Sequence, residues 1–316
     1  MEGEKPVSIL VVGSMAFDTV RTPFGEAPEV LGGSANYFSV AASFFTDVRL
    51  VAVVGEDFPN QHLDYLRTRR VDLRGLQQVP GKTFRWVGEY GHDFNEARTL
   101  DTQLNVFADF APKIPEDYRD SEVVFLANID PDLQREVLRQ VRRPALVAAD
   151  TMNYWIDGKP DSLKQTLAHV DMLIINDAET RQLAKDSNLV RAARTIQGWG
   201  PRILIIKRGE YGALLFGEDG WFSAPALPLE GVQDPTGAGD SFAGGAVGYL
   251  AQRMRFDMGT LRQAMIMGSV MASFNVEAFS LDRLRTLTTA EIEERFRTFK
   301  RLVQFDDLEI GSGVSR

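Results

Sequence analysis

An acidic residue follows a run of small residues at one place in the chain, in a pattern suited to phosphoryl transfer. The run from Asp234 to Phe242 reads DPTGAGDSF, and a helical pattern follows it. Gly237, Ala238 and Gly239 leave backbone N–H groups uncovered at a helix start, where unpaired donors and the helix dipole attract anions. Asp240, in the first helical turn, stays ionised there and can take the proton of an attacking alcohol. Capping the helix is the alternative role for this carboxylate.

Further polar and glycine residues come near the ends of two short apolar runs in the N-terminal part of the chain. Asp18 follows the first run, and Gly32 and Gly33 precede a helical pattern that begins at Ser34. Each of these features, taken alone, is typical of a tight turn.

In the middle of the chain, two apolar runs are each followed by polar or glycine residues. Asn176 and Glu179 come after the first, and Lys207, Gly209 and Gly212 after the second. Ligands bind at the carboxyl ends of parallel strands, so these residues are candidates for a binding site. Local roles remain open, because Asn-x-x-Glu also forms a capping box and Gly-x-x-Gly a turn.

The elements that must position these residues alternate between strands and helices. Short apolar runs of this kind are typical of strands buried on both faces of a parallel sheet. The predicted strands are Ser8–Val12, Val48–Val54, Glu122–Leu126, Ala145–Ala149, Met172–Ile175 and Ile203–Ile206. Helical patterns lie between them, and the chain after Gly237 is mainly helical. The alternation predicts a three-layer α/β/α fold with a mainly parallel central sheet, and no linker divides residues 1–316, so we expect a single domain.

Two segments, about 19–30 and 81–110, interrupt this alternation. Their period-two pattern predicts antiparallel strands, which could form a small β-lid over a pocket or ordinary surface hairpins. The second segment is rich in aromatic residues that could stack on a sugar or nucleobase, although a core of the lid is the favoured role for most of them. These residues are Phe84, Trp86, Tyr90, Phe107 and Phe110.

Composition excludes several classes of function. The chain has 35 basic and 44 acidic residues and a formal net charge of −9, so no broad basic surface is expected and nucleic acid is not an expected partner. The absence of cysteine excludes disulfides, thiolate zinc sites and cysteine nucleophiles. No apolar run has the length of a membrane span or a signal-peptide core, so we expect a cytoplasmic protein without a membrane partner.

The run from Asp234 to Asp240 resembles the signature of the ribokinase-like (PfkB) carbohydrate and nucleoside kinase family, Asp-Thr-x-Gly-Ala-Gly-Asp. Here Pro235 stands in the second position and Thr236 follows. The resemblance implies that Asp240 is the catalytic base. It also implies that the N–H groups of Gly237, Ala238 and Gly239 stabilise charge on the transferring phosphoryl group.

The other motifs fall in the order in which this family carries them. Asp18 is similar to the family's substrate-binding Asp, and Gly32 and Gly33 resemble its di-glycine, which lets the sugar approach the backbone. Together with Asp240, these residues are the substrate-binding candidates that the resemblance implies.

The resemblance also implies a nucleotide site with magnesium. Asn176 and Glu179 resemble the family's Asn-x-x-Glu motif, in which the Glu organises Mg²⁺, usually through water. Lys207, Gly209 and Gly212 resemble the turn beside ATP, to which Gly237 and Gly239 also contribute. Lys207 at a strand end can equally be a solvated surface lysine.

The chain departs from the family pattern at three places. Relatives often carry Asn where this chain has Tyr37, with an Asn one position earlier, at Asn36. Asp150 stands where relatives carry Asp-x-Asn, and capping is an equal alternative there. The stretch Phe274–Ser280 lacks the usual Gly-containing loop of the monovalent-cation site, so dependence on such a cation stays open.

The sequence therefore predicts an ATP- and Mg²⁺-dependent kinase that phosphorylates a hydroxymethyl group of a sugar or ribonucleoside. A kinase of the same fold acting on a vitamin-type hydroxymethyl heterocycle, and a catalytically silent ligand-binding protein, are the alternatives. A lid that pairs with its twin in a second copy would make a homodimer.

Overall fold

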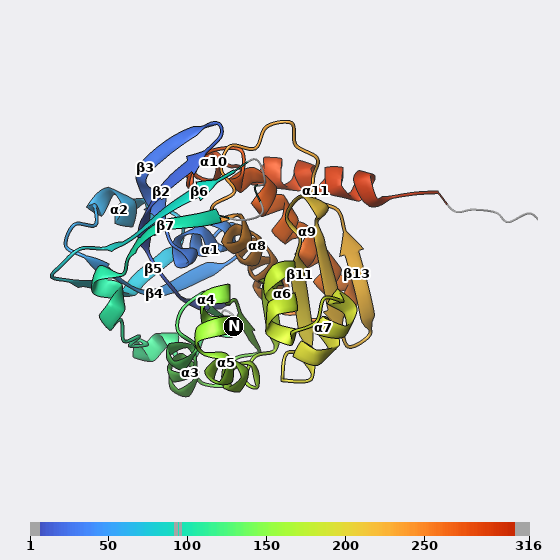
Figure 1. The fold of residues 1–316 in the computed structure, drawn as a ribbon, viewed down its shortest axis with the longest axis horizontal. Coiled ribbons are helices and arrows are strands. Elements are labelled where there is room, and N and C mark those ends of the chain that lie inside the picture. The colour runs from blue at the N-terminus through green and yellow to red at the C-terminus, as the bar shows by residue number, and fades with distance from the viewer. Residues whose placement is uncertain (1–6, 92–93, 95–96, 307–316) are drawn as a thin grey trace, which may run out of the picture.

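The computed structural model describes residues 7–91, 94 and 97–306, which form a large sheet between two layers of helices and a smaller sheet at one side (Figure 1). The predicted three-layer α/β/α fold with a mainly parallel sheet is confirmed. The large sheet has nine strands in the order β13-β12-β11-β10-β9-β8-β1-β4-β5. Pairing is parallel from β5 to β11, and β12 pairs antiparallel with both β11 and β13, so β12 alone runs against the other strands of this sheet.

All six predicted strands are present, and no strand end differs from its prediction by more than one residue. The strands of the large sheet are β1 (Ser8–Val12), β4 (Asp47–Gly55), β5 (Val71–Val79), β8 (Val123–Leu126), β9 (Leu146–Ala149), β10 (Met172–Asn176), β11 (Ile203–Lys207), β12 (Ala213–Gly217) and β13 (Gly220–Ala224). The sequence pattern does not predict β5, because this edge strand is half-exposed and carries polar residues instead of an apolar run.

The two helical layers follow from the way each central strand alternates its side chains between the faces of the sheet. Ile9 and Val11 of β1 join one buried cluster, with helices α1, α2, α8, α9, α10 and α11. Leu10 and Val12 join the other, with helices α3 to α7. The helices are α1 (Ser34–Ala42), α2 (Asn60–Thr68), α3 (Pro131–Gln140), α4 (Asn153–Gly158), α5 (Pro160–Leu167), α6 (Asp177–Ala184), α7 (Leu189–Gln197), α8 (Ala238–Arg253), α9 (Met258–Asn275), α10 (Asp282–Thr286) and α11 (Thr289–Val303). No helix within these described ranges is long and apolar enough to cross a membrane.

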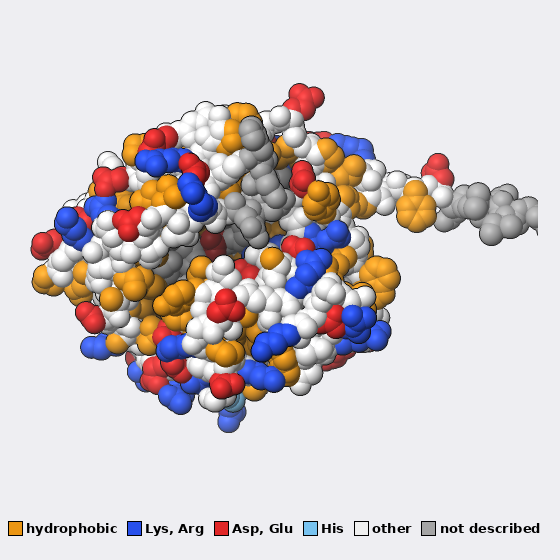
Figure 2. Space-filling view, viewed as in Figure 1, with side chains coloured by type: hydrophobic (Ala, Val, Ile, Leu, Met, Phe, Trp, Pro, Cys, Tyr) orange, Lys and Arg blue, Asp and Glu red, His pale blue; other side chains and the backbone are white. Residues whose placement is uncertain are grey.

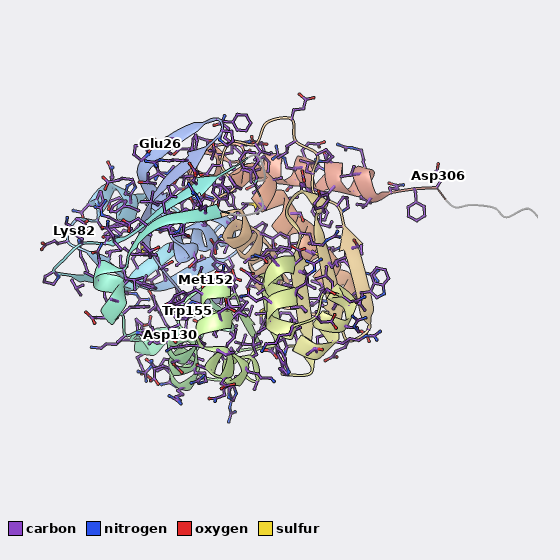
Figure 3. The ribbon with its side chains drawn as sticks, in the orientation of Figure 1. Glu26, Lys82, Asp130, Met152, Trp155 and Asp306 are labelled. Carbon is purple, nitrogen blue, oxygen red and sulfur yellow. The ribbon has the colours of Figure 1, made fainter. Side chains whose placement is uncertain are left out.

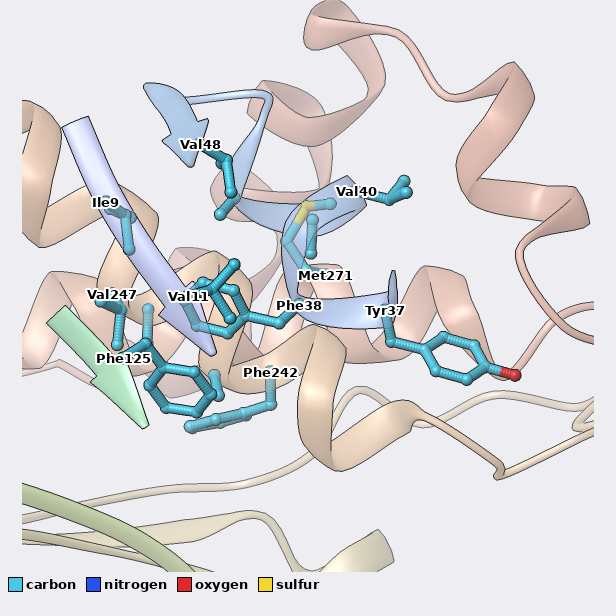
Figure 4. Packing of buried hydrophobic residues seen from close by; sticks show 14 of the residues in the cluster. Ile9, Val11, Tyr37, Phe38, Val40, Val48, Phe125, Phe242, Val247 and Met271 are labelled. Carbon is cyan, nitrogen blue, oxygen red and sulfur yellow. The ribbon is translucent and has the colours of Figure 1, made fainter. Parts of the chain in front are cut away.

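The first of these clusters fixes helices α1 and α8 against the sheet (Figure 4). The rings of Phe38 on α1 and Phe125 on β8 stack with their centroids 4.0 Å apart. Val11 of β1 and Val247 of α8 pack in the same cluster. Removing a buried ring of this kind costs about 3–5 kcal/mol, so Phe38 is a main anchor of the layer that carries the DPTGAGD run.

The segments 19–30 and 81–110 contribute to one four-stranded sheet, in the order β3-β2-β6-β7. Its strands are β2 (Ala16–Thr22), β3 (Gly25–Gly32), β6 (Phe84–Tyr90) and β7 (Ala97–Gln103). The expectation of purely antiparallel strands was wrong, because β2 and β6 pair in parallel. β2 follows β1 in the chain, and β6 follows β5. Because β1 and β5 end at the same edge of the large sheet, β2 and β6 start from that edge and run in the same direction.

Three of the aromatic residues in segment 81–110 form a stack between the small sheet and the main body: Phe84 lies on β6, while Phe107 and Phe110 lie in and just after the 3-10 helix Asn105–Asp109. The ring of Phe107 stacks on Phe84 at 5.3 Å and on Phe110 at 5.7 Å between centroids. These rings therefore have a packing role, but Phe107 and Phe110 pack on the buried cluster under helices α3 to α7 rather than in a separate core of the lid.

Candidate active site

The residues singled out in the sequence meet at the carboxyl ends of the central strands. Asn176 ends β10 and Lys207 ends β11, while Ala238 begins α8 in the middle of the molecule. Figure 2 shows a hollow in this face, between the small sheet and helices α4 and α6, with acidic side chains visible inside it. The hollow is the candidate active site.

The turn before α8 has a geometry that only glycine adopts easily. Gly237 has φ 74°, in the left-handed region. A Cβ atom there would lie 2.3 Å from the ring of Tyr37, so the ring is packed directly against the turn. The N–H of Ala238 donates to the carbonyl of Pro235 at 3.1 Å and helps to close the turn. The N–H of Gly239, in the first helical turn, has no intrahelical acceptor and remains available to an anion.

Asp240 lies in the first turn of α8, among other charged groups. Burial raises the pKa of Asp240 to about 7; the carboxylate of Asp150 also raises it, and the ammonium of Lys207 lowers it. A base with a pKa near the operating pH is well suited to general base catalysis.

Asp18 lies on β2 with its side chain buried. Burial raises the pKa of Asp18 to about 7, an effect to which the carboxylates of Asp234 and Asp240 add. The N–H of Gly33 donates a hydrogen bond that opposes this shift. Asp18 on β2 and Asp240 on α8 are therefore close enough for their charges to interact.

Gly32 and Gly33 hold Asp18 in place. A Cβ atom on Gly32 would lie 2.0 Å from Oδ2 of Asp18, and one on Gly33, which has φ 91°, would lie 2.6 Å from the carbonyl oxygen of Ser14. The absence of side chains at Gly32 and Gly33 thus lets the carboxylate of Asp18 and the backbone of Ser14 come close to this turn. Asn36, which stands one position before the place where relatives often carry Asn, donates from Nδ2 to the carbonyl of Gly32 at 2.5 Å and so stabilises this turn.

Lys207 is largely buried, and so it is not a solvated surface lysine. Its Nζ lies 3.7 Å from Oδ2 of Asp150, and 17% and 8% of the two side chains are exposed. A Cβ atom on Gly239 would lie 2.8 Å from the same Nζ, so the ammonium lies against the start of α8. Burial alone would lower the pKa of Lys207, but the nearby carboxylates, chiefly those of Asp150 and Glu179, outweigh it and raise the pKa.

Asn176 and Glu179 form a capping box at the start of α6. Oδ1 of Asn176 accepts from the N–H of Glu179 at 2.7 Å, and Oε2 of Glu179 accepts from the N–H of Asn176 at 2.8 Å. Burial, followed by the carboxylate of Asp150, raises the pKa of Glu179 to about 7. The capping role is therefore present, and it leaves Oε1 outside the cap.

The acidic residues at the site suit a magnesium ion that is bound together with nucleotide phosphates, rather than one held by protein ligands alone. Across residues 7–91, 94 and 97–306, no three His, Cys, Asp or Glu side chains gather as a metal-binding group. Magnesium in phosphoryl-transfer sites takes one or two carboxylates and completes its shell with water and substrate phosphates. Glu179 and Asp150, whose charges influence each other, match that need.

The turn after β11 is also built on glycine. Gly209 and Gly212 have φ 52° and 87°, and the N–H of Arg208 donates to the carbonyl of Gly212 at 2.8 Å. A Cβ atom on Gly212 would lie 2.0 Å from the carbonyl oxygen of Ala224, so this turn is pressed against β13.

Several contacts of the glycine-rich turn with distant residues could not be predicted from the sequence. Asp234 is fully buried, and its carboxylate accepts from the N–H of Thr236 at 2.8 Å and from that of Ser280 at 3.1 Å. Oγ1 of Thr236 donates to the hydroxyl of Tyr90 at 3.4 Å. The glycine-rich turn is therefore tied both to the segment after α9 and to the small sheet. The sequence signalled the turn but not these distant partners.

Helix α4 borders the hollow and is held by side chains of the neighbouring loops (Figure 3). Nε1 of Trp155 donates to Oδ1 of Asn128 at 3.1 Å, and Nδ2 of Asn128 lies 3.0 Å from the sulfur of Met152. Lys159, just after α4, pairs with Asp130 at 2.7 Å. These contacts give the hollow a fixed wall on this side.

A separate cavity of about 840 Å³ lies at the opposite, amino ends of β1, β4 and β5. Its arginines are engaged by carboxylates: Arg70 lies 2.8 Å from Asp47, and Arg67 lies 2.7 Å from Asp64. None of the motif residues lines it, so it is not part of the candidate active site.

Comparison with known proteins agrees with this arrangement. Residues 8–285 match the family described as pfkB family carbohydrate kinase. A cytidine kinase of Thermococcus kodakarensis is 31% identical over 245 residues, which are 76% of this chain and 87% of that protein.

Solved structures share the fold. A nucleoside kinase of Burkholderia thailandensis in complex with inosine has a TM-score of 0.75 at 21% identity, over 92% of this chain and 97% of the other. A putative ribokinase II from E. coli in complex with ATP and Mg²⁺ has a TM-score of 0.73 at 17% identity, over 92% and 99% of the two chains. The fold, the order of the motifs and the match over most of the sequence together show that this chain belongs to the pfkB family of carbohydrate kinases.

Proposed function

We propose that this kinase transfers the γ-phosphoryl group of ATP to the hydroxymethyl group of a ribonucleoside or a sugar, with Asp240 as the general base. The observation that carries the proposal is the meeting of Asp240 with Asp18 and the Gly237 turn in one hollow. The family is one of phosphotransferases that act on an alcohol group, and the names of the relatives place nucleosides among the acceptors to test first.

The acceptor would lie between the two acids, with its ring hydroxyls on Asp18 and its hydroxymethyl group at Asp240. Asp240 accepts the hydroxyl proton as the acceptor oxygen forms a bond to the γ-phosphorus and the bond from that phosphorus to ADP breaks. The N–H groups of Gly237 and Gly239 donate to the oxygens on which negative charge collects. The pKa of Asp240 near 7 lets it be ionised before the reaction and protonated after it.

ATP would lie between the Lys207 to Gly212 turn and the start of α8. The N-terminus of α8 attracts the phosphates through its free donors and its dipole. Lys207 adds a positive charge against that terminus and counters the surrounding carboxylates. Asn176 fixes Glu179 at the edge of this volume through the capping box.

Magnesium bound with ATP would neutralise phosphate charge. Glu179, acting through water, is the residue we assign to it, with Asp150 beside it. The small sheet of β2, β3, β6 and β7 is proposed as a lid that limits entry of water and so reduces hydrolysis of ATP.

A coupled assay of ADP release tests the proposal. Wild type and Asp240→Asn are compared with MgATP and each of cytidine, inosine and D-ribose. Release of ADP that depends on an acceptor and is lost in the variant supports the proposal. If ATP binds but no sugar or nucleoside stimulates ADP release, the assignment to this acceptor class fails.

A further inference from the structure

Trp86 lies directly beside Asp18 on the small sheet. The two residues are paired in the parallel register of β2 and β6, and adjacent strands lie about 4.8 Å apart. Side chains of residues paired in this way point to the same face of the sheet. An indole therefore accompanies the carboxylate that we assign to the acceptor.

The indole lies flat across the sheet. A Cβ atom on Gly88 would lie 1.9 Å from Cη2 of Trp86, 2.3 Å from Cζ2 and 2.6 Å from Cζ3. These three distances put that position above Cη2, at the rim of the ring, and out of the plane of the ring, so the plane of the indole runs along the sheet. Only a glycine leaves room for the ring to cover the strand in this way, and Gly88 itself is buried.

A hydrogen bond fixes the ring in this orientation. Nε1 of Trp86 donates to Oγ1 of Thr99 at 3.1 Å, and Thr99 is the residue of β7 paired with Gly88. The indole thus spans β6 and β7 with one face on the sheet and the other turned away from it. Trp86 remains partly exposed.

This face of the small sheet is turned toward the glycine-rich turn. Tyr90 lies on the same face of β6 as Trp86, two alternations along the strand, and its hydroxyl accepts from Thr236. Asp18, on the same face of β2, is close enough to Asp240 for the two charges to influence each other. The indole therefore belongs to the wall of the hollow that contains Asp240.

The other large aromatic rings of this segment are already occupied. Phe107 stacks on Phe84 and on Phe110, and this stack packs on the buried cluster under helices α3 to α7. Trp86 has no ring or cation stacked on it among the described residues. A flat apolar ring beside a carboxylate matches a planar heterocycle attached to a hydroxylated ring, and a free sugar offers nothing to cover it.

We propose that Trp86 is the stacking surface for a nucleobase, so that the preferred acceptor is a ribonucleoside rather than a free sugar. The proposal rests on the proposed function above and makes it more specific. Gly88 and Thr99 are the positioning residues that hold the indole in the orientation for stacking.

The test compares acceptor kinetics of wild type, Trp86→Leu and Trp86→Phe with cytidine, inosine and D-ribose. Trp86→Leu should raise KM for the preferred nucleoside about 10-fold or more, since stacking on one base is worth roughly that in binding, while kcat and KM for ATP stay close to wild type. Trp86→Phe should retain part of the affinity, because it keeps an aromatic face. Val87→Ala, next to Trp86 but on the opposite face of β6, is the matched control and should match wild type.

Two readouts separate a stacking role from a structural one. Binding of the nucleoside should quench tryptophan fluorescence in wild type and much less in Trp86→Phe, which keeps the other three of the four tryptophans. Thr99→Val keeps the indole but removes its hydrogen bond, so its KM should lie between those of wild type and Trp86→Leu. Melting temperatures identify any variant that has simply lost its fold.

The outcomes distinguish this inference from the proposed function. If wild type phosphorylates none of the three acceptors, the proposed function fails. If wild type phosphorylates a nucleoside and folded Trp86→Leu keeps the same KM, only the stacking role is overturned. A higher kcat/KM for D-ribose than for either nucleoside, or an equal loss with ribose and nucleoside in Trp86→Leu, also overturns it.

Discussion

The ammonium of Lys207 lies 3.7 Å from the carboxylate of Asp150, and both side chains are largely buried. The same ammonium lies against Gly239 at the start of α8 and lowers the pKa of Asp240 against the effects of burial and Asp150. This pair therefore links the end of β11 to the proposed base, and its loss should change both stability and the pH dependence of turnover.

Replacing Lys207 by Met should shift the acid limb of the pH profile of kcat/KM to higher pH. The ammonium favours the ionised form of Asp240, so its removal raises the pKa of the base and leaves it protonated over a wider range. Profiles between pH 5.5 and 9 measure the shift. Lys300→Met removes an exposed ammonium from the last turn of α11 and should leave the profile as in wild type; equal profiles for both variants would remove Lys207 from this role.

Lys207→Met should also destabilise the fold by about 3–5 kcal/mol, because it leaves the buried carboxylate of Asp150 without its oppositely charged partner. Urea unfolding of the single variants and of the double variant Asp150→Asn/Lys207→Met measures the interaction. The double variant should recover part of the loss. Strictly additive effects of the two substitutions would show that the pair contributes no coupling.

Asp240→Asn should bind ATP as wild type does, while turnover falls by roughly 10² to 10⁴, the usual contribution of a general base. Steady-state ADP release and a separate titration with ATP measure the two properties. The matched control is Asp161→Asn, which changes an exposed acid in the first turn of α5. Turnover like that of wild type in Asp240→Asn would exclude the carboxylate as the base.

Gly237→Ala should reduce both stability and turnover. Alanine at φ 74° is strained, and its Cβ would meet the ring of Tyr37, so the turn must move from under the transferring phosphoryl group. A loss of about 1–3 kcal/mol in the free energy of unfolding is expected. Gly231→Ala has no atom within 4 Å of the added Cβ and should be nearly neutral. Similar behaviour of the two variants would contradict the importance of the turn geometry.

Stability of the ligand-free protein should decrease as pH rises from about 4 to about 7. Burial raises the pKa of Asp18, Glu179 and Asp240 to about 7, so the folded state keeps protons that the unfolded chain has already released in this window. Acids whose pKa is lowered, such as Asp132 with a pKa of about 2, release their protons below this pH range. Urea midpoints at pH 5, 6, 7 and 8 measure the slope, which should be smaller in Asp18→Asn than in Asp161→Asn. Parallel slopes in the two variants would refute the contribution of Asp18.

Local patterns in the sequence were sufficient for much of the fold and for the identity of the site. Apolar runs predicted six strands because a strand buried on both faces requires apolar residues at every position. The DPTGAGD run predicted the start of α8 because small residues and an acid near a helix terminus are local requirements. The motif order then indicated the family, which the match over residues 8–285 shows.

The tertiary structure decided which distant residues meet. Tyr37 supports Gly237, Lys207 faces Asp150, and Thr236 contacts Tyr90, although each pair is far apart in the sequence. The parallel register of β2 and β6 placed Trp86 beside Asp18, and the period-two pattern alone predicted the wrong direction. A pattern of residue types fixes which face of an element is buried, whereas the partner on that face depends on how the elements pack, and so only the folded chain shows it.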